Sequence, residues 1–285
     1  MKKPCEVYNV QETTTDNKDF IRDRDEVFRI LENAVISKAE RMRLLQIFKV
    51  AYHDSESSKI YGICSIDSSS VGCDFCAMMV ELAKKNPLII CGGCYARKGN
   101  FKSTYVKDRH TLNMIIMSSV RFELDELAML PISTIYCRFN SNGDITNDIM
   151  MYNYHGIMVS HPFTRFGLWA KNVGPVNRVF RELGKPENCD FIQSSVIVNE
   201  PVKNPSPFAD HTFTVYLTEE DVEEAVKNGA CSCNGRHCME CGYKCYANTW
   251  PKGTDIAELY RGSEKQRQLL IKLHKEWKEK RNHAA

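Results

Sequence analysis

Cysteine placement is the feature of this 285-residue chain that most restricts how it can fold. Ten of its thirteen cysteines fall into two short stretches, one at residues 64–94 and the other at residues 231–245. The fold must therefore gather many thiols in two places or bury each of them separately. Thiols this dense usually form disulfides or bind metal.

The cellular compartment decides between these two uses of the thiols. No apolar run reaches the roughly 20 residues that cross a bilayer, and the N-terminal residues lack the apolar core of a secretory signal. These features predict a cytoplasmic protein without a membrane partner, in which clustered cysteines indicate metal or redox chemistry. The net charge of +2 gives no electrostatic argument for binding nucleic acid or an anionic membrane.

The first stretch contains two C-x2-C pairs, Cys73 with Cys76 and Cys91 with Cys94, separated by fourteen residues. Two such pairs at about this separation are typical of a four-thiolate zinc site, but iron–sulfur clusters also take four thiolates. The spacing alone favours zinc, and both metals stay open at this point. The two glycines between Cys91 and Cys94 predict that backbone approaches the thiolates closely there.

The second stretch holds four thiols within thirteen residues, in the pattern Cys233-x4-Cys238-x2-Cys241-x3-Cys245. A run this compact is more typical of a ferredoxin-like cluster loop than of a zinc module, whose two pairs usually lie farther apart. His237 is an alternative ligand, although four cysteines already complete a ligand set.

The remaining cysteines have other expected roles. Cys64 and Cys231 lie next to the two groups, and the sequence leaves open whether they are ligands; we expect Cys64 to be a bystander. Cys137 and Cys189 lie in apolar, strand-like surroundings, where a free cysteine packs as a small hydrophobic residue. Cys5 stands apart from all of them.

Hydrophobic patterning predicts an α/β fold with a parallel sheet. Strands are expected at residues 132–139, 163–170, 191–198 and 211–217, and helices at residues 104–129, 147–160, 175–183 and 254–281. Strands that alternate with helices in this way are typical of right-handed βαβ units. The pattern does not say whether the sheet closes into a barrel.

The chain divides into three expected parts. Residues 1–57 form an N-terminal helical region, in which Ser37 and Glu40 predict a capping box. Residues 58–230 carry the first cysteine group and the β/α domain, and residues 231–285 carry the second cysteine group and a long docking helix.

Polar residues at the predicted strand ends indicate where chemistry would take place, because parallel β/α folds collect their sites at the carboxyl ends of the strands. We expect a catalytic role for Arg138, Asp144 and Lys171. We expect cofactor contacts from Asn140, Gly143 and Ser194, with Ser195 as the alternative to Ser194.

Two of these residues have a plainer alternative role. Asp144 follows Asn142 and Gly143, so its carboxylate either holds a substrate amine or ribose hydroxyl or merely caps a βα turn. Lys171 either binds a carboxylate or phosphate as a point charge or is simply solvated.

Taken in order, these elements resemble the phage-associated "gene product 88" domain family, which is also found in bacterial genomes. Residues 91–98 are similar to its Cys-Tyr-Ala element, and the helix around Asn113 is similar to its Asn-containing helix. Residues 138–144 are similar to its Arg-(x)n-Gly-Asp strand end, residues 166–171 to its next, aromatic-rich strand, and residues 233–245 to its C-terminal cysteine-rich element.

The resemblance runs over about residues 58–262 and implies a fold and cofactors. Members of the family are regarded as metal-binding proteins of radical-SAM-like character, with a partial β/α barrel and cysteines before and behind it. The resemblance therefore implies two iron–sulfur clusters of the 4Fe-4S type, with S-adenosylmethionine as a further cofactor.

The chain also departs from the family pattern. The C-x3-C-x2-C signature of radical SAM enzymes is absent, which weakens the implication of S-adenosylmethionine. Asn142 stands where the family has serine, and Tyr246 stands where it tends to have tryptophan. The first cysteines lie farther apart than in the family, so the ligand choice between Cys73 and Cys76 stays open.

Two hypotheses from different classes follow. The first is an iron–sulfur protein, of radical-SAM-like or electron-transfer type, with a small molecule or a macromolecule as substrate; its metal ligands are Cys73, Cys76, Cys91, Cys94, Cys233, Cys238, Cys241 and Cys245. The second is a non-enzymatic protein whose fold is held by zinc and which presents a surface to nucleic acid or protein. The sequence shows no basic patch with interleaved aromatic residues, which disfavours nucleic acid.

Overall fold

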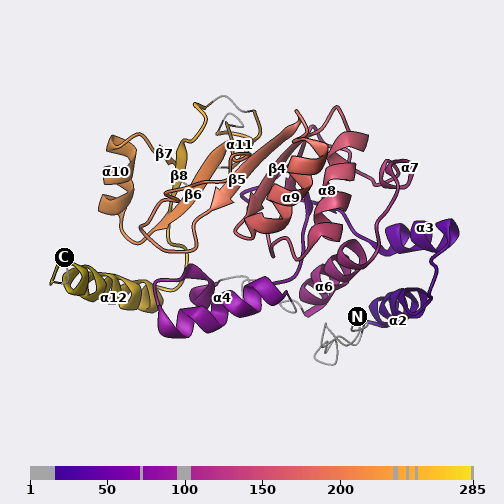
Figure 1. Cartoon of the computed structure of the whole chain (residues 1–285), viewed down its shortest axis with the longest axis horizontal. Coiled ribbons are helices and arrows are strands. Elements are labelled where there is room, and N and C mark those ends of the chain that lie inside the picture. The colour runs from indigo at the N-terminus through magenta and orange to yellow at the C-terminus, as the bar shows by residue number, and fades with distance from the viewer. Residues whose placement is uncertain are drawn as a thin grey trace.

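The computed structural model describes residues 17–70, 73–94, 104–233, 237–241, 244–247 and 250–283. Its centre is an eight-stranded sheet of order β1-β2-β3-β4-β5-β6-β8-β7 (Figure 1). The strands are β1 (Ala51–Tyr52), β2 (Cys64–Ile66), β3 (Tyr136–Phe139), β4 (Arg165–Ala170), β5 (Cys189–Ser194), β6 (His211–Tyr216), β7 (Cys231–Ser232) and β8 (Asp255–Leu259). Among the described strands only β1 is antiparallel to its neighbour, so the predicted α/β fold with a mostly parallel sheet is confirmed.

Helices connect and flank these strands. They are α2 (Lys18–Leu31), α3 (Lys38–Ile47), α4 (Asp74–Lys85), the 3-10 helix η2 (Ile90–Gly93), α6 (Thr104–Ser119), α7 (Leu124–Leu127), α8 (Asp148–Ser160), α9 (Val173–Leu183), α10 (Glu219–Lys227), α11 (Lys244–Ala247) and α12 (Glu264–His283). Figure 1 shows α4 and α12 along the lower edge of the sheet, and α2 and α3 at the end away from α12. Each of the three expected parts of the chain contributes a strand to the same sheet.

One face of the sheet, called here the helix face, carries the main hydrophobic core. Alternate strand residues such as Phe139, Phe166 and Phe191 point to this face and are fully buried. Phe139 stacks on Tyr154 of α8 with ring centroids 4.2 Å apart, and Phe180 of α9 meets Phe191 edge-on at 6.2 Å. Helices α8 and α9 therefore cover this face.

The other face of the sheet, called here the opposite face, carries a different set of side chains. In the parallel register Arg138 lies beside Gly167, and Gly167 lies beside Asp190. Tyr246 of α11 packs on this face, with its ring centroid 5.9 Å from that of Trp169. A β-carbon at Gly167 would lie 2.4 Å from the Trp169 ring and 3.0 Å from the Tyr246 ring, so glycine makes room for both rings.

The predicted capping box is confirmed, and a second helix start has a cap that was not predicted. Ser37 and Glu40 form the expected capping box at the start of α3. Asn147 caps α8 by accepting a 2.9 Å hydrogen bond from the backbone of Met150. These local signals place both helix starts within one residue of their expected positions.

The prediction of one helix over residues 104–129 is wrong, because α6 ends at Ser119 and only the short α7 follows. The break is caused by Asn153 of α8. Its amide donates to the carbonyls of Met117 and Val120 at 2.8 and 2.7 Å, and its carbonyl accepts from the backbone of Phe122 at 3.0 Å. A tertiary contact therefore supplies the partners that a continuing helix would have supplied.

The prediction of a helix over residues 254–281 is wrong in its first part. Residues 255–259 form β8, which pairs with both β6 and β7, and α12 begins only at Glu264. Asp255 accepts hydrogen bonds from Thr212 and Thr214 of β6 at 2.7 and 2.9 Å. Ile256 and Leu259 have helical spacing in the sequence, but these cross-strand partners outweigh it.

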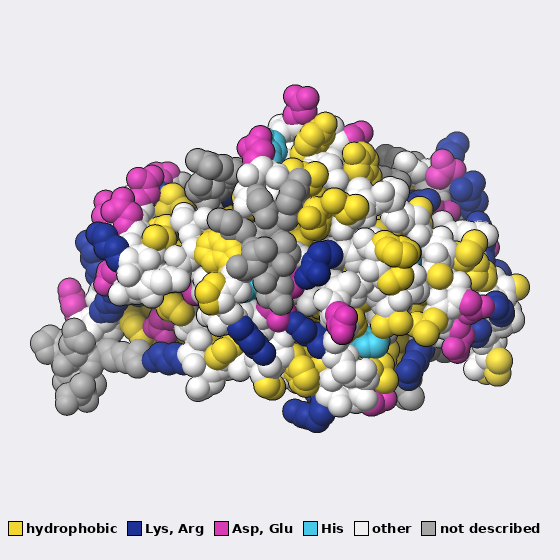
Figure 2. All heavy atoms as spheres, turned by 90° about the horizontal axis from the view of Figure 1, so that it is seen from above, with side chains coloured by type: hydrophobic (Ala, Val, Ile, Leu, Met, Phe, Trp, Pro, Cys, Tyr) yellow, Lys and Arg dark blue, Asp and Glu magenta, His cyan; other side chains and the backbone are white. Residues whose placement is uncertain are grey.

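The described surface is mixed in charge on the face shown in Figure 2. Basic and acidic side chains are interspersed there, and no broad basic patch is visible among the coloured side chains. Among the described residues, no helix has the length and apolar character that a membrane crossing requires.

The buried imidazole of His211 should make the stability of the protein depend on pH. It is 2% exposed, neither ring nitrogen has a hydrogen-bond partner in the described part of the chain, and burial lowers its pKa below the ordinary value. Below pH 6.5 the unfolded chain gains a proton here that the folded chain does not, so stability falls as the pH drops. Between pH 7.5 and 5.5 the free energy of unfolding of the wild type, measured by urea denaturation, should fall by about 1 kcal/mol more than that of His211→Gln. Equal losses in the two proteins would contradict this.

Candidate functional site

Buried polar side chains gather where β2 and β3 end. Because these strands are parallel neighbours, the loops that follow them meet at the same edge of the sheet. The buried residues of the two loops are Asp67, Ser68, Ser69, Ser70, Asn140, Asn142 and Asp144. Buried polar groups are costly unless they are hydrogen-bonded, so such a concentration indicates a built site.

Asp67 connects the two loops and was missed by the sequence analysis. Its carboxylate accepts hydrogen bonds from the Ser65 hydroxyl at 2.6 Å, from the Asn142 backbone at 3.0 Å and from the Ser141 hydroxyl. His53 Nε2 lies 2.8 Å from the same Ser65 hydroxyl. In this arrangement the serine lies between the histidine and the aspartate, whereas a catalytic triad requires the histidine between them. The group is therefore a positioning network.

Asn142 extends this network to a second histidine. Its amide nitrogen lies 2.8 Å from Nδ1 of His110, and burial lowers the pKa of that histidine. Asn142 Oδ1 is buried without a hydrogen-bond partner among the described residues. A buried acceptor of this kind is available to a ligand that enters from the edge of the sheet.

Asp144 also forms hydrogen bonds to the loop that follows β4. Its carboxylate accepts from the backbone amides of Ile145, Lys171 and Asn172 at 2.8, 2.9 and 3.3 Å. Burial raises the pKa of Asp144, and the neighbouring Lys171 opposes that rise. The carboxylate thus fills the capping role that the sequence offered as an alternative, and it fixes the backbone of Lys171 at the end of β4.

The other residues that were predicted at the strand ends are placed as follows. Gly143 has φ +85°, and Asn140 has φ +57° with its side chain bonded to Ser68, Tyr154 and the Trp169 carbonyl. Ser194 is buried at the end of β5, whereas the Ser195 hydroxyl bonds to the carbonyls of the turn that follows it. Asn140 and Ser195 therefore hold the fold.

The first cysteine group adjoins this edge of the sheet. Cys73 occupies the N-cap position of α4 without a side-chain capping bond, and Cys76 lies in the first turn. A hydrogen bond between the two thiols lowers the pKa of Cys73 and raises that of Cys76. Cys91 lies in η2, and Cys94 follows it. Burial alone would lower the pKa of Lys171, but Cys91, Asp144, Cys94 and Cys76 hold it above its ordinary value. The predicted Lys171 and the first cysteine group thus share one neighbourhood.

The two glycines between Cys91 and Cys94 make room for neighbouring side chains. A β-carbon at Gly92 would lie 2.7 Å from that of Ala83 on α4, and one at Gly93 would lie 2.3 Å from the Gln266 amide of α12. Both glycines let η2 pack closely between two helices. This packing brings the Cys91–Cys94 turn against the helix that carries Cys73 and Cys76.

The second cysteine group lies on the opposite face of the sheet. Burial raises the pKa of Cys245, and so do Cys233, Cys241 and Cys238, while Arg138 opposes them. The mutual influence of the four thiols places them in one neighbourhood. Among the described residues, a small hydrophobic cluster that includes Tyr246 and Trp169 surrounds Cys238 and Cys245.

Lys59 is a second residue that the sequence analysis missed. Its ammonium lies 3.0 Å from the Cys233 sulfur and 2.5 Å from a Glu258 oxygen. Burial works to lower the pKa of Lys59, but Glu258 and Cys233 keep it raised. No sequence signal could have identified it, because its partners lie 174 and 199 residues farther along the chain.

The loop of the second group is anchored to the segment before β2. The Cys238 backbone donates to the Lys59 carbonyl at 2.7 Å, and His237 Nδ1 donates to the Ser58 carbonyl at 2.9 Å. Because a carbonyl oxygen only accepts, Nδ1 of His237 carries a proton in this bond.

Arg138 lies beside the second group. Its guanidinium lies 4.1 Å from the centre of the Trp169 ring, and it opposes the rise of the pKa in both Cys238 and Cys245. It stands one residue before the end of β3, which places it between this group and the polar edge of the sheet.

The remaining described cysteines are structural or peripheral. Cys64, Cys137 and Cys189 are buried in the core of the helix face, as expected of packing residues. Cys231 is half-buried in β7. Cys5 and residues 95–98, which the sequence analysis also used, lie outside the described residues.

Both cysteine groups have suitable donors, although their ligand geometry is not preformed. Among the described residues, no three His, Cys, Asp or Glu side chains are arranged to hold one metal ion, and no two cysteines form a disulfide. Each group nevertheless brings four thiols together with a half-buried lysine, Lys171 for the first and Lys59 for the second. A thiolate-ligated cluster is anionic, so this combination of donors and cations fits a four-cysteine metal centre.

Comparisons with known proteins add no further assignment. No family model matches the chain, and neither curated proteins nor solved structures give a match. The site must therefore be interpreted from its own chemistry.

Proposed function

We propose that this protein is an iron–sulfur protein with two four-cysteine clusters and that it acts as an electron-transfer or radical-type enzyme. The observation that carries the proposal is the placement of the two cysteine groups around the same strands. The first adjoins Asp144 and Lys171, which lie just beyond the ends of β3 and β4. The second lies beside Arg138 and Trp169 on the opposite face of those strands.

The order of the strands supports a partial barrel of the radical-SAM-like kind. Strands β2 to β6 lie side by side in the order of the sequence and are all parallel. Sequential parallel strands with helices on one face are the arrangement from which β/α barrels are built. In such folds substrates meet the carboxyl ends of the strands, where the polar edge lies in this chain.

The chain's own residues have definite tasks in this proposal. A bound iron–sulfur cluster would supply single-electron transfer. Cys73, Cys76, Cys91 and Cys94 would hold the first cluster, and Lys171 would offset its negative charge. Asp144 fixes the loop that carries Lys171, and Asn142 Oδ1 presents an acceptor at the edge of the sheet.

The second cluster would be held by Cys233, Cys238, Cys241 and Cys245. Lys59 donates to Cys233, and Arg138 lies close enough to the group to stabilise its thiolates. Hydrogen bonds and cations around thiolate ligands raise the reduction potential of a cluster. Lys59 and Arg138 therefore set the potential at this position.

Zinc at the first group is the competing proposal, and one observation favours it. The helix α4 and the turn of η2 present two C-x2-C pairs side by side, which is also how zinc modules present their ligands. In that case the first group stabilises the fold, and the chain presents a surface to a partner protein.

Metal analysis of the full-length protein tests the proposal. Protein purified without oxygen should be brown, with several irons per chain and a matching amount of inorganic sulfide. Visible absorption and iron, sulfide and zinc assays on the same sample provide the measurement. A colourless protein with stoichiometric zinc would overturn the proposal, and iron for one cluster together with one zinc would confine it to the second group.

A further inference from the structure

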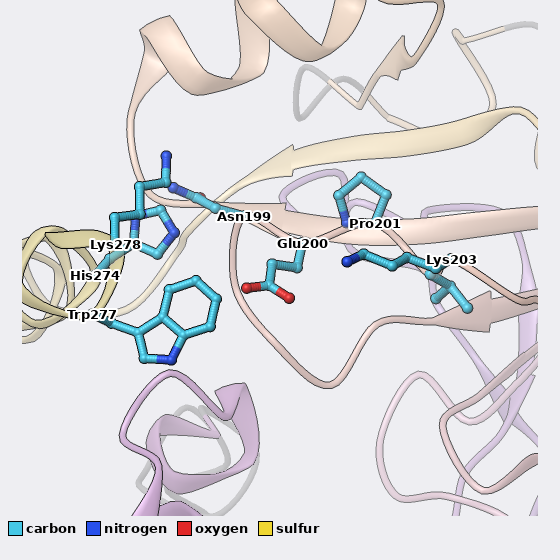
Figure 3. Close-up of a pocket in the computed structure, with 8 residues that line it drawn as sticks. Asn199, Glu200, Pro201, Lys203, His274, Trp277 and Lys278 are labelled. Carbon is cyan, nitrogen blue, oxygen red and sulfur yellow. The ribbon is translucent and has the colours of Figure 1, made fainter. Parts of the chain in front are cut away.

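A cavity in the described part of the chain lies apart from both cysteine groups. It has a volume of about 600 Å³ and lies between α12 and the loop that follows β5 (Figure 3). Its walls include Glu200 and Lys203 from the loop, and His274, Trp277 and Lys278 from α12. Cavities that hold small organic ligands have volumes of roughly 300–1,000 Å³.

Hydrogen bonds hold the loop that forms one wall of the cavity. Asn199 adopts φ +57° in the left-handed region, and its side chain donates to Asp221 at 2.9 Å and accepts from the Leu217 backbone at 2.8 Å. The Ser195 hydroxyl donates to the Glu200 carbonyl at 2.7 Å. Backbone held in this region by several partners is often found at binding sites. These bonds fix the position from which Glu200 extends.

Glu200 has an unused acceptor. Its Oε1 is buried, and no described residue donates a hydrogen bond to it. Figure 3 shows the Glu200 carboxylate between the Trp277 indole and the Lys203 side chain. A buried carboxylate oxygen without a donor is costly, and a ligand with N–H groups would relieve that cost.

The α12 side of the cavity offers a flat aromatic wall. The rings of Trp277 and His274 are 6.2 Å apart and inclined by only 15°. Burial and the nearby Lys278 lower the pKa of His274, with Asp221 and Glu200 opposing them, so the imidazole adds no positive charge at neutral pH. A planar heterocycle would stack on this wall.

The rim of the cavity is basic. Lys203 and Lys278 are both exposed and lie on opposite walls, one on the loop and one on α12. A neighbouring cavity of about 430 Å³ shares Asn199 and Lys278 with the first, and its other walls include the carboxylates of Asp221, Glu224 and Asp255. An anionic group would therefore be directed toward the two lysines and away from those carboxylates.

We propose that this cavity binds a purine nucleotide, with the base stacked on Trp277, its N–H edge on Glu200 and its phosphates between Lys203 and Lys278. Guanine is preferred over adenine, because its N1–H and amino group donate side by side to one carboxylate. Adenine presents a single amino group next to a ring acceptor, which repels the second carboxylate oxygen. The site is independent of the metal content of the cysteine groups.

Isothermal titration of the full-length protein with GDP, ADP, CDP and inorganic pyrophosphate tests the proposal. GDP should bind about tenfold more tightly than ADP, and more tightly than CDP or pyrophosphate. Glu200→Gln keeps the size of the side chain and should abolish the difference between GDP and ADP. Trp277→Leu should weaken all three nucleotides about tenfold.

A matched control is available on α12. Lys278→Gln should weaken GDP and reduce the salt dependence of binding, whereas Lys272→Gln, an exposed lysine on the same helix that does not line the cavity, should leave both unchanged. Absence of GDP binding, equal binding of GDP and pyrophosphate, or an unchanged preference in Glu200→Gln would each overturn the proposal. Glu200→Gln is decisive where Trp277→Leu is unstable, because Trp277 also packs against a small hydrophobic core.

Discussion

Replacing Cys241 with alanine is expected to remove the iron of one cluster, about half of the total, and to leave the other half in place. Cys241 belongs to the second group, where its thiol donates to the Cys238 carbonyl at 3.2 Å and lies among three other thiols. Loss of one of four thiolates should prevent that cluster from assembling. Iron and sulfide assays on protein purified without oxygen measure the effect.

The controls separate ligands from packing cysteines. Cys91→Ala should remove the other half of the iron, because Cys91 lies with the first group beside Lys171. Cys137→Ala should retain all of it and lose only about 1 kcal/mol of stability, since Cys137 is fully buried in the core of the helix face. Equal iron losses from Cys241→Ala and Cys137→Ala would show that the cysteines are divided wrongly.

Replacing Gly143 with alanine is expected to lower the free energy of unfolding by at least about 3 kcal/mol. Gly143 has φ +85°, and a β-carbon there would lie 2.1 Å from the Ser68 hydroxyl and 2.4 Å from the Ser68 carbonyl oxygen. The substitution therefore adds both backbone strain and a collision with backbone that cannot move away. Urea denaturation of the variant and the wild type measures the loss.

Gly253 provides the matched control for this prediction. It has φ +89°, close to that of Gly143, but nothing lies within 4 Å of the β-carbon that alanine would add. Gly253→Ala should therefore cost only the backbone term, about 1 kcal/mol. The difference between the two variants measures the close approach of the loops after β2 and β3. Equal losses would mean that these loops are not in tight contact.

The fold class could be predicted from the sequence because the signals that define it are local. Apolar runs marked β3, β4, β5 and β6 to within a few residues, and the capping box of Ser37 and Glu40 marked the start of α3. Where the prediction failed, a distant partner decided the outcome. Asn153 ends α6 from another helix, and residues 255–259 become a strand only because β6 lies beside them.

The candidate site also contains residues that local sequence signals identify and residues that they do not. Asp144 and Lys171 could be predicted because each follows a strand end, and the cysteines are conspicuous by their number. Asp67 was missed because β2 is only three residues long and leaves little hydrophobic pattern to mark its end. Lys59 was missed because its significance depends on Cys233 and Glu258, which are remote in sequence.

The anchoring of the second cysteine group has a consequence for biosynthesis. The Cys233 backbone bonds to Ala257, the Cys238 backbone bonds to Lys59, and the Lys59 ammonium bridges Cys233 and Glu258. These surroundings cannot exist until the last strand of the sheet has left the ribosome and paired with β6. All four cysteines of the first group lie within residues 73–94, so they emerge early, and only the packing of Gly93 against α12 must wait for the end of the chain. Maturation should therefore proceed from the first group to the second, and a chain that stops before β8 should mature only at the first.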